Sequence, residues 1–133
     1  MKTKIFQNLF LILVFCSFFI STSYAQDAEK SNVKKQYVYK LKLIPELLDE
    51  KNWTEKENNI VGAHFNRLKE FTEKGIVILA GRTMNTDESQ FGIVIFTAAD
   101  DMEAEKFMKD DPAVKEKIMT SELFPFYVAL LKK

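Results

Sequence analysis

The chain has 133 residues, with 19 basic and 19 acidic side chains, and 47% of its residues are hydrophobic. This balance excludes a strongly basic nucleic-acid-binding protein and gives no electrostatic reason to bind an anionic membrane surface. The chain has a single cysteine, which excludes an internal disulfide framework, so a hydrophobic core must stabilise the fold.

Residues 1–25 have the three-part pattern of a secretory signal peptide. Two lysines precede an apolar run over residues 9–20, and small residues stand at positions 23 and 25, where a signal peptidase inspects the chain. The run is shorter than the about 20 residues that a permanent membrane helix needs. Cys16 offers a lipoprotein anchor as an alternative, but the bulky Phe15 before it does not suit lipoprotein processing. We therefore expect cleavage after Ala25 and a secreted or periplasmic protein without a stable membrane anchor.

Cleavage at that point would leave 17 basic and 19 acidic residues and no cysteine. Residues 26–35, QDAEKSNVKK, are polar and aperiodic, which is typical of a disordered linker. The remaining segment, residues 36–133, is long enough for one hydrophobic core and too short for two. We therefore expect a single domain there.

The domain begins with a predicted strand over residues 36–44, QYVYKLKLI. Its large apolar side chains alternate with Val38, Lys40 and Lys42, which is the period-two pattern of a strand. Pro45 ends the strand. Thr54 followed by Glu57 has the pattern of a capping box, and this pattern predicts the start of a helix.

This helix is predicted to run to Lys74, with Gly75 supplying a left-handed C-cap. Its apolar residues recur at spacings of three and four, as expected for a buried face. His64, the only histidine of the chain, stands four residues after Ile60 and four before Leu68, so it faces inward. The apolar positions of the predicted face are Ile60, Val61, Phe65, Leu68 and Phe71.

The sequence of the second half of the domain predicts two strands, a short helix and a last strand. The apolar run 76–82 and the segment 90–98 are strands, joined by a polar loop. Residues 99–110 form a helix that opens on capping aspartates and breaks at Asp111-Pro112, because a residue before proline avoids the helical region. Residues 113–119 can add one or two turns, and 121–131 form the last strand, in which Pro125 indicates a bulge or an edge position.

The predicted order β-α-β-β-α-β is that of an α+β, ferredoxin-like fold, with both helices on one face of an antiparallel sheet. The other face also needs a cover, because the runs IVILA, GIVIF and FYVALL are apolar on both sides of their strands. A second copy would provide it, so we expect a homodimer packed sheet to sheet. Lys40 and Lys42 would then extend to an edge or line a polar pocket.

The sequence offers few sites for catalysis. One histidine and no cysteine in the exported chain leave no pattern of metal ligands, and there is no phosphate loop, nucleophile elbow or dinucleotide fingerprint. We therefore expect no metal and no cofactor. The acidic pairs Asp100-Asp101 and Asp110-Asp111 are interpreted as solvated helix ends.

Three polar residues in apolar surroundings remain as candidates. His64 can act as a general acid or base, or it can be a buried histidine bonded to a carbonyl or carboxylate. Arg82 can bind a substrate oxyanion, or it can be a solvated strand-end charge or an ion-pair partner of Asp111. Asp111 can orient the imidazole, or it can serve only as the end of a helix at an Asp-Pro turn.

The segments HFNRLKEFTEKGIVILAGRT, FGIVIF and DDPAVKEKIMTSELFPFYVALL resemble the YciI-like, or YCII-related domain, proteins over roughly residues 60–131. The resemblance implies a ferredoxin-like fold that dimerises as an α+β barrel, and an active site built on His64 and Asp111, with Arg82 as their neighbour. Many relatives have Gly-Pro where this chain has Gly81-Arg82, and many lack an export signal.

The resemblance also implies lyase or isomerase chemistry on small aromatic or lactone compounds, although family membership does not by itself determine a reaction. In this interpretation His64 moves a proton, Asp111 orients it and Arg82 neutralises charge on a substrate oxygen. The alternative is a non-catalytic dimeric binding or interaction module, in which the polar residues only satisfy one another.

Overall fold

The computed structural model describes residues 34–132, so the predicted signal peptide, its cleavage site and most of the predicted linker lie outside the described residues. The elements in chain order are β1 (Lys35–Leu43), the short 3-10 turns η1 (Pro45–Leu47) and η2 (Glu50–Asn52), α2 (Glu55–Glu73), β2 (Val77–Arg82), β3 (Gly92–Ala98), α3 (Asp101–Lys109), α4 (Pro112–Lys115) and β4 (Met119–Phe126).

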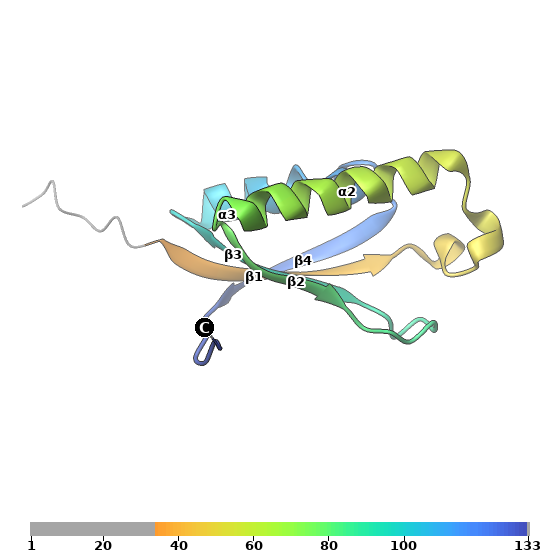
Figure 1. The fold of residues 1–133 in the computed structure, drawn as a ribbon. Coiled ribbons are helices and arrows are strands. Elements are labelled where there is room, and N and C mark those ends of the chain that lie inside the picture. Colours follow the sequence, from red (N-terminus) through yellow and green to blue (C-terminus); the bar gives the residue numbers. More distant parts are fainter. Residues whose placement is uncertain (1–33, 133) are drawn as a thin grey trace, which may run out of the picture. The chain divides into compact units, whose positions relative to one another are not determined.

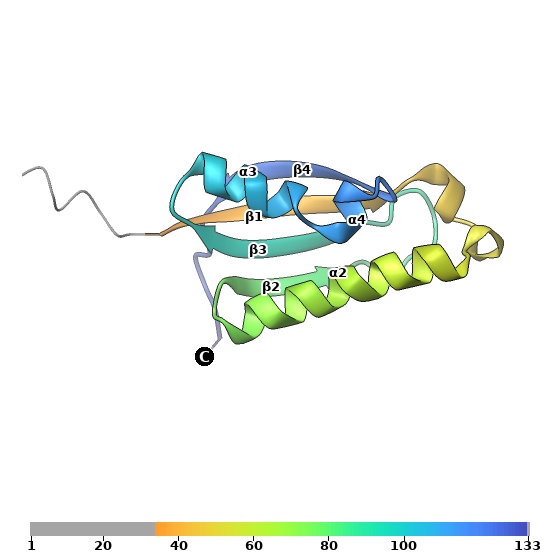
Figure 2. The same cartoon turned by 90° about the horizontal axis from the view of Figure 1, so that it is seen from above.

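The four strands form one antiparallel sheet in the order β2-β3-β1-β4. All three helices lie on one face of this sheet, as Figure 1 shows. Seen from above, α2 lies over β2, while α3 and α4 lie over the other side of the sheet (Figure 2). The predicted α+β, ferredoxin-like fold is confirmed.

All four strands differ from their predicted ranges at one or both ends. β1 starts at Lys35, inside the predicted linker, and β4 spans Met119–Phe126 rather than residues 121–131. The pairing register explains where β4 ends. Phe126 pairs with Gln36, so the ladder has almost reached the first residue of β1 and has no partner for a longer strand. β4 is an edge strand, which is the position that Pro125 indicated.

The ends of α2 agree with the sequence. Thr54 and Glu57 form the capping box, and Gly75, at φ 70°, follows the C-cap Lys74. The predicted buried face was wrong at Phe65, whose side chain is 64% exposed. Phe65 follows His64 directly, so it points about 100° further around the helix. A half-buried Arg67 instead joins His64, Leu68 and Phe71 on the inner side.

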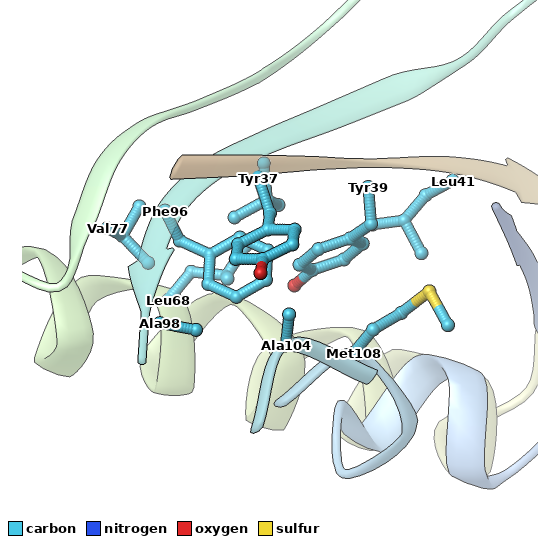
Figure 3. Close-up of a cluster of buried hydrophobic side chains, with 10 residues drawn as sticks. Tyr37, Tyr39, Leu41, Leu68, Val77, Phe96, Ala98, Ala104 and Met108 are labelled. Carbon is cyan, nitrogen blue, oxygen red and sulfur yellow. The ribbon is translucent and has the colours of Figure 1, made fainter. Parts of the chain in front are cut away.

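The main core lies between β1, β3 and the helices. Tyr37, Tyr39 and Leu41 project from β1 toward the helix layer (Figure 3). The ring of Phe96 from β3 stacks on Phe107 from α3, with ring centroids 4.5 Å apart. Tyr39 is 0% exposed and packs edge-on against both of these rings. A buried aromatic layer therefore surrounds the side chain of Tyr39.

The opposite face of the sheet is covered by no element of the described chain (Figure 1). Leu79, Phe124 and Phe126 are 43%, 47% and 42% exposed, and the register places Leu79 and Phe124 on the face of Val38. Lys40 lies on this face too, with its ammonium 5.3 Å from the centre of the Phe91 ring. We call this surface the open sheet face. Among residues 34–132, no helix is long and apolar enough to cross a membrane.

Candidate active site

Asp111 lies at the centre of a buried polar cluster between the sheet and the helices. It is the N-cap of α4, where its Oδ1 accepts a hydrogen bond from the backbone N–H of Ala113 at 3.0 Å. The Asp111 side chain is 0% exposed and is the only buried charged side chain in the described part of the chain. The Asp-Pro turn predicted from the sequence is present. It directs the carboxylate inward.

His64 reaches this carboxylate from the middle of α2. Its Nδ1 lies 2.8 Å from both Oδ1 and Oδ2 of Asp111, although 47 residues separate the two positions. The His64 side chain is 13% exposed. Within residues 34–132, Nε2 takes part in no hydrogen bond. The structure therefore joins the two residues that the sequence singled out as a pair, and leaves one imidazole nitrogen for another molecule.

Tyr39 is a third member of the cluster. Its hydroxyl donates a hydrogen bond to Oδ2 of Asp111 at 2.8 Å. Burial, the nearby charge of Asp111 and this hydrogen bond all raise the pKa of Tyr39 well above its usual value, with Arg67 opposing them. The phenol therefore stays protonated and remains a donor. Sequence reasoning interpreted Tyr39 as an ordinary core residue, because an inward-facing aromatic in an alternating strand carries no mark of a site.

Arg67 is the fourth member, and it too was missed from the sequence. Its Nη1 lies 4.0 Å from Oδ2 of Asp111, and its Nη2 donates to the backbone carbonyl of Phe107 at 2.8 Å. The guanidinium carbon lies 4.3 Å from the ring centre of Phe107 and 4.9 Å from that of Phe71. A signal was available, because an arginine three residues after His64 falls on the inner side of the helix.

The surroundings of Asp111 keep its carboxyl group ionised. Burial alone raises the pKa of Asp111, because it disfavours the charged form. Hydrogen bonds from His64, Tyr39 and the Ala113 N–H, together with the charge of His64, outweigh burial and lower the pKa below its usual value. Asp111 is thus an anion at neutral pH and accepts every hydrogen bond that it makes.

This arrangement has a direct chemical consequence for His64. Because an ionised carboxylate only accepts hydrogen bonds, Nδ1 of His64 must carry a hydrogen. In the neutral ring Nε2 then has a lone pair and can act as a base, and after protonation it can act as an acid. Asp111 itself is enclosed, and its two oxygens hold the ring in this orientation.

The structure does not bring Arg82 to this cluster. Arg82 is exposed at the end of β2, and among residues 34–132 it forms no ion pair with Asp111, whose arginine neighbour is Arg67. Arg82 pairs with Gly92, which in turn pairs with Leu41, so its side chain lies on the helix-covered face of the sheet. It shares that face with Tyr39 while remaining open to solvent.

An open groove lies between the first half of α2 and α4. Its apolar lining includes Ile60, Ala63 and Pro112, and Lys56 and Glu116 add charge. The volume is about 610 Å³, within the range of small-molecule sites. Ala63 and Pro112 are the chain neighbours of His64 and Asp111, but the side chains of the cluster do not line this groove. The described residues hold no group of three side chains suited to bind a metal ion.

The sequence model of the YCII-related domain matches residues 36–126, which includes every residue of this cluster. The chain belongs to the YCII-related domain family. No curated protein matches the sequence.

A solved structure shares the fold of this YCII-related domain. It is 5-chloro-2-hydroxyhydroquinone dehydrochlorinase from Burkholderia phenoliruptrix AC1100, in complex with 2,5-dihydroxybenzoquinone. The two chains superpose with a TM-score of 0.53 at 18% identity, over 69% of this chain and 93% of the dehydrochlorinase. At this identity the likeness extends to the fold alone.

Proposed function

We propose that this YCII-related protein is a small-molecule enzyme that uses His64 as a general acid/base. The observation that carries the proposal is the contact of His64 Nδ1 with both oxygens of the buried Asp111, at 2.8 Å. Such a pair holds one tautomer and one ring orientation, and so presents Nε2 for proton transfer.

The reaction is of the lyase or isomerase type. Nε2 removes a proton from a carbon or oxygen of the substrate, and the electron pair left behind forms a double bond. The bond to the leaving group breaks at the same time, and the leaving group takes the electron pair of that bond. An isomerase would instead return the proton to a second position. In both cases the imidazolium that forms is stabilised by the Asp111 anion, which Tyr39 and the Ala113 N–H hold in place.

The substrate class that we propose is hydroxylated aromatic or quinone compounds. The support is the family, together with the dehydrochlorinase that shares the fold, whose ligand is a dihydroxybenzoquinone. Substrates of this class carry acidic oxygens, and Arg82 lies exposed on the same sheet face as Tyr39, where it would neutralise such an oxygen.

A binding screen tests this proposal. Hydroxylated quinones and hydroquinones are added to the protein, and the melting temperature is measured. A ligand at 100 times its dissociation constant adds about 2.7 kcal/mol to the free energy of unfolding, which is readily detected in a domain of this size.

Arg82→Met is expected to weaken the stabilisation by anionic ligands and to leave the stability of the unliganded protein unchanged. If no compound of this class binds, the proposed substrate class is wrong. A ligand that binds and is never converted favours the non-catalytic binding module instead.

We also propose that two copies pack through their open sheet faces. Support comes from Leu79, Phe124 and Phe126, which form an apolar surface beyond what a single chain covers. Sizing with light scattering is expected to give twice the monomer mass at micromolar concentration. Phe124→Glu is expected to shift the protein to a monomer, because it would bury an unpaired charge.

The matched control is Met102→Glu, which places the same charge on a 78% exposed residue in the first turn of α3. This variant is expected to keep the mass of the parent protein. A parent protein that runs as a monomer would refute the sheet-to-sheet packing.

Export is the third part of the proposal, and it rests on residues 1–25 alone. The mature protein would act outside the cytoplasm, in the periplasm or the medium. Its N-terminus is expected to be Gln26, and recovery of the intact leader on the protein in the cytoplasmic fraction would contradict export.

A further inference from the structure

Arg67 has a buried guanidinium nitrogen beside the His64–Asp111 pair. Its Nη1 is buried and forms no hydrogen bond within the described residues, and its nearest anion is Oδ2 of Asp111 at 4.0 Å. The Arg67 side chain is 15% exposed, and the rings of Phe71 and Phe107 flank its guanidinium. Burying a guanidinium nitrogen without a hydrogen bond is costly, so the arrangement calls for a role inside the protein.

The charges of the cluster indicate what that role is. A carboxylate that binds a histidine stabilises the protonated form of the ring. The cation of Arg67 opposes this, because it compensates the same carboxylate. With neutral His64 the cluster carries one negative and one positive charge. Protonation of the ring would leave a net positive charge in a buried site, which is unfavourable.

We propose that Arg67 is a positioning residue that keeps His64 neutral near neutral pH, so that Nε2 is available as a base. Arg67 acts through Asp111 and the electrostatic potential of the cluster, without touching the substrate. Its Nη2 bond to the Phe107 carbonyl and its two aromatic neighbours hold the guanidinium at this distance.

The other titratable groups around the pair are placed so that their charges affect the protonation of His64 less than the charge of Arg67 does. Tyr39 on β1 stays neutral because its pKa is raised. On α3, Lys106 is paired with the exposed Asp110 at the helix end. Lys56 of α2 and Glu116 after α4 line the open groove, and Arg82 is exposed on β2, so solvent screens all three. The charge of Arg67 is screened less than these, because its side chain is only 15% exposed.

The test is a pH titration of the imidazole by NMR in the untagged protein, in which His64 is the only histidine and its signal is unambiguous. Arg67→Met keeps the apolar stem against the two rings and removes the charge. The pH at which half of the His64 rings are protonated is expected to rise by about one unit in this variant. Arg67→Lys keeps a cation and is expected to restore most of the difference.

The matched control is Lys69→Met, which removes one positive charge from an exposed position of the same helix. Its titration midpoint is expected to move by less than about 0.2 units, since solvent screens this charge. A folded Arg67→Met variant with an unchanged or lower midpoint overturns the proposal.

If Arg67→Met does not fold, Arg67→Gln, which also removes the charge, is titrated in its place. A folded Arg67→Gln protein whose His64 midpoint does not rise overturns the proposal. This inference rests on the proposed role of His64 as a base. Because the titration needs no substrate, however, it can fail while the enzyme hypothesis stands, and it can succeed if the protein has no activity.

Discussion

Replacing His64 with asparagine is expected to lower kcat for the substrate by about 10²–10⁴-fold, which is the usual contribution of a general acid/base. Asparagine can still donate a hydrogen bond to Asp111 from its side-chain amide, so the buried carboxylate keeps a partner. The variant therefore loses the nitrogen that can take up a proton, and it keeps the hydrogen bond to Asp111. The loss is therefore expected in kcat, with a small change in ligand affinity.

The measurement is turnover of a compound that the binding screen identifies, for the parent protein and for His64→Asn. Circular dichroism and sizing show whether the variant keeps its fold and its oligomeric state. Asn66→Ala, at an exposed position two residues further along the same helix, is the control and is expected to keep full activity. A folded His64→Asn protein that turns over substrate as fast as the parent would remove the histidine from the mechanism.

Asp111→Ala is expected to lower the free energy of unfolding by about 3–5 kcal/mol, because removing one partner of a buried ion pair leaves the other charge uncompensated. The Arg67 cation would remain buried beside the rings of Phe71 and Phe107. The Tyr39 hydroxyl and the Ala113 N–H would also lose their acceptor. Urea denaturation measures the change. A loss below about 1 kcal/mol would show that the cluster contributes little to stability.

Asp111→Asn tests the contribution of the negative charge alone, since the amide fills the same space as the carboxylate and its oxygen still accepts hydrogen bonds. The sign of its pH dependence follows from the lowered pKa of Asp111. A carboxyl group with a lower pKa in the folded than in the unfolded chain adds stability above the unfolded value. That contribution is lost as pH falls through the folded value. The advantage of the parent protein over Asp111→Asn is therefore expected to be full above pH 3.8 and to shrink below it.

Local sequence patterns predicted most of the secondary structure. The capping box of Thr54 and Glu57, the C-cap at Gly75 and the Asp-Pro break are short-range features, and each is present in the structure. Their hydrogen bonds join residues a few positions apart, so the chain can form them without reference to the rest of the fold. The handedness of the connections then placed the helices on one face of the sheet.

The same local patterns failed where tertiary packing decides. Phe65 fits the apolar spacing of its helix and yet is 64% exposed, because the neighbouring elements cover only a narrow side of α2. Arg67, a charged residue, occupies a half-buried place instead. Hydrophobicity alone cannot identify such an exchange, since an arginine is tolerated in the interior only where an anion and aromatic rings receive it.

Two of the four residues of the candidate site could be predicted from the sequence. His64 and Asp111 stood out as polar residues in apolar surroundings, and the family resemblance paired them. The contact itself needed the structure, because 47 residues separate the two positions. Tyr39, 72 residues from Asp111, and Arg67 could be assigned to the site only once β1, α2 and α4 were seen to converge on the same carboxylate.

The sequence by itself determined the α+β, ferredoxin-like fold and the ends of the long helix, since short-range hydrogen bonds and hydrophobic periodicity specify these. It also singled out the two residues of the proposed acid/base pair, but their pairing came from the family resemblance. The tertiary structure alone decided which side chains surround Asp111. Arg67 and Tyr39 enclose the carboxylate while Arg82 stays exposed on the sheet. The physical reason is that burial and the strength of a charge interaction depend on elements brought together from distant parts of the chain.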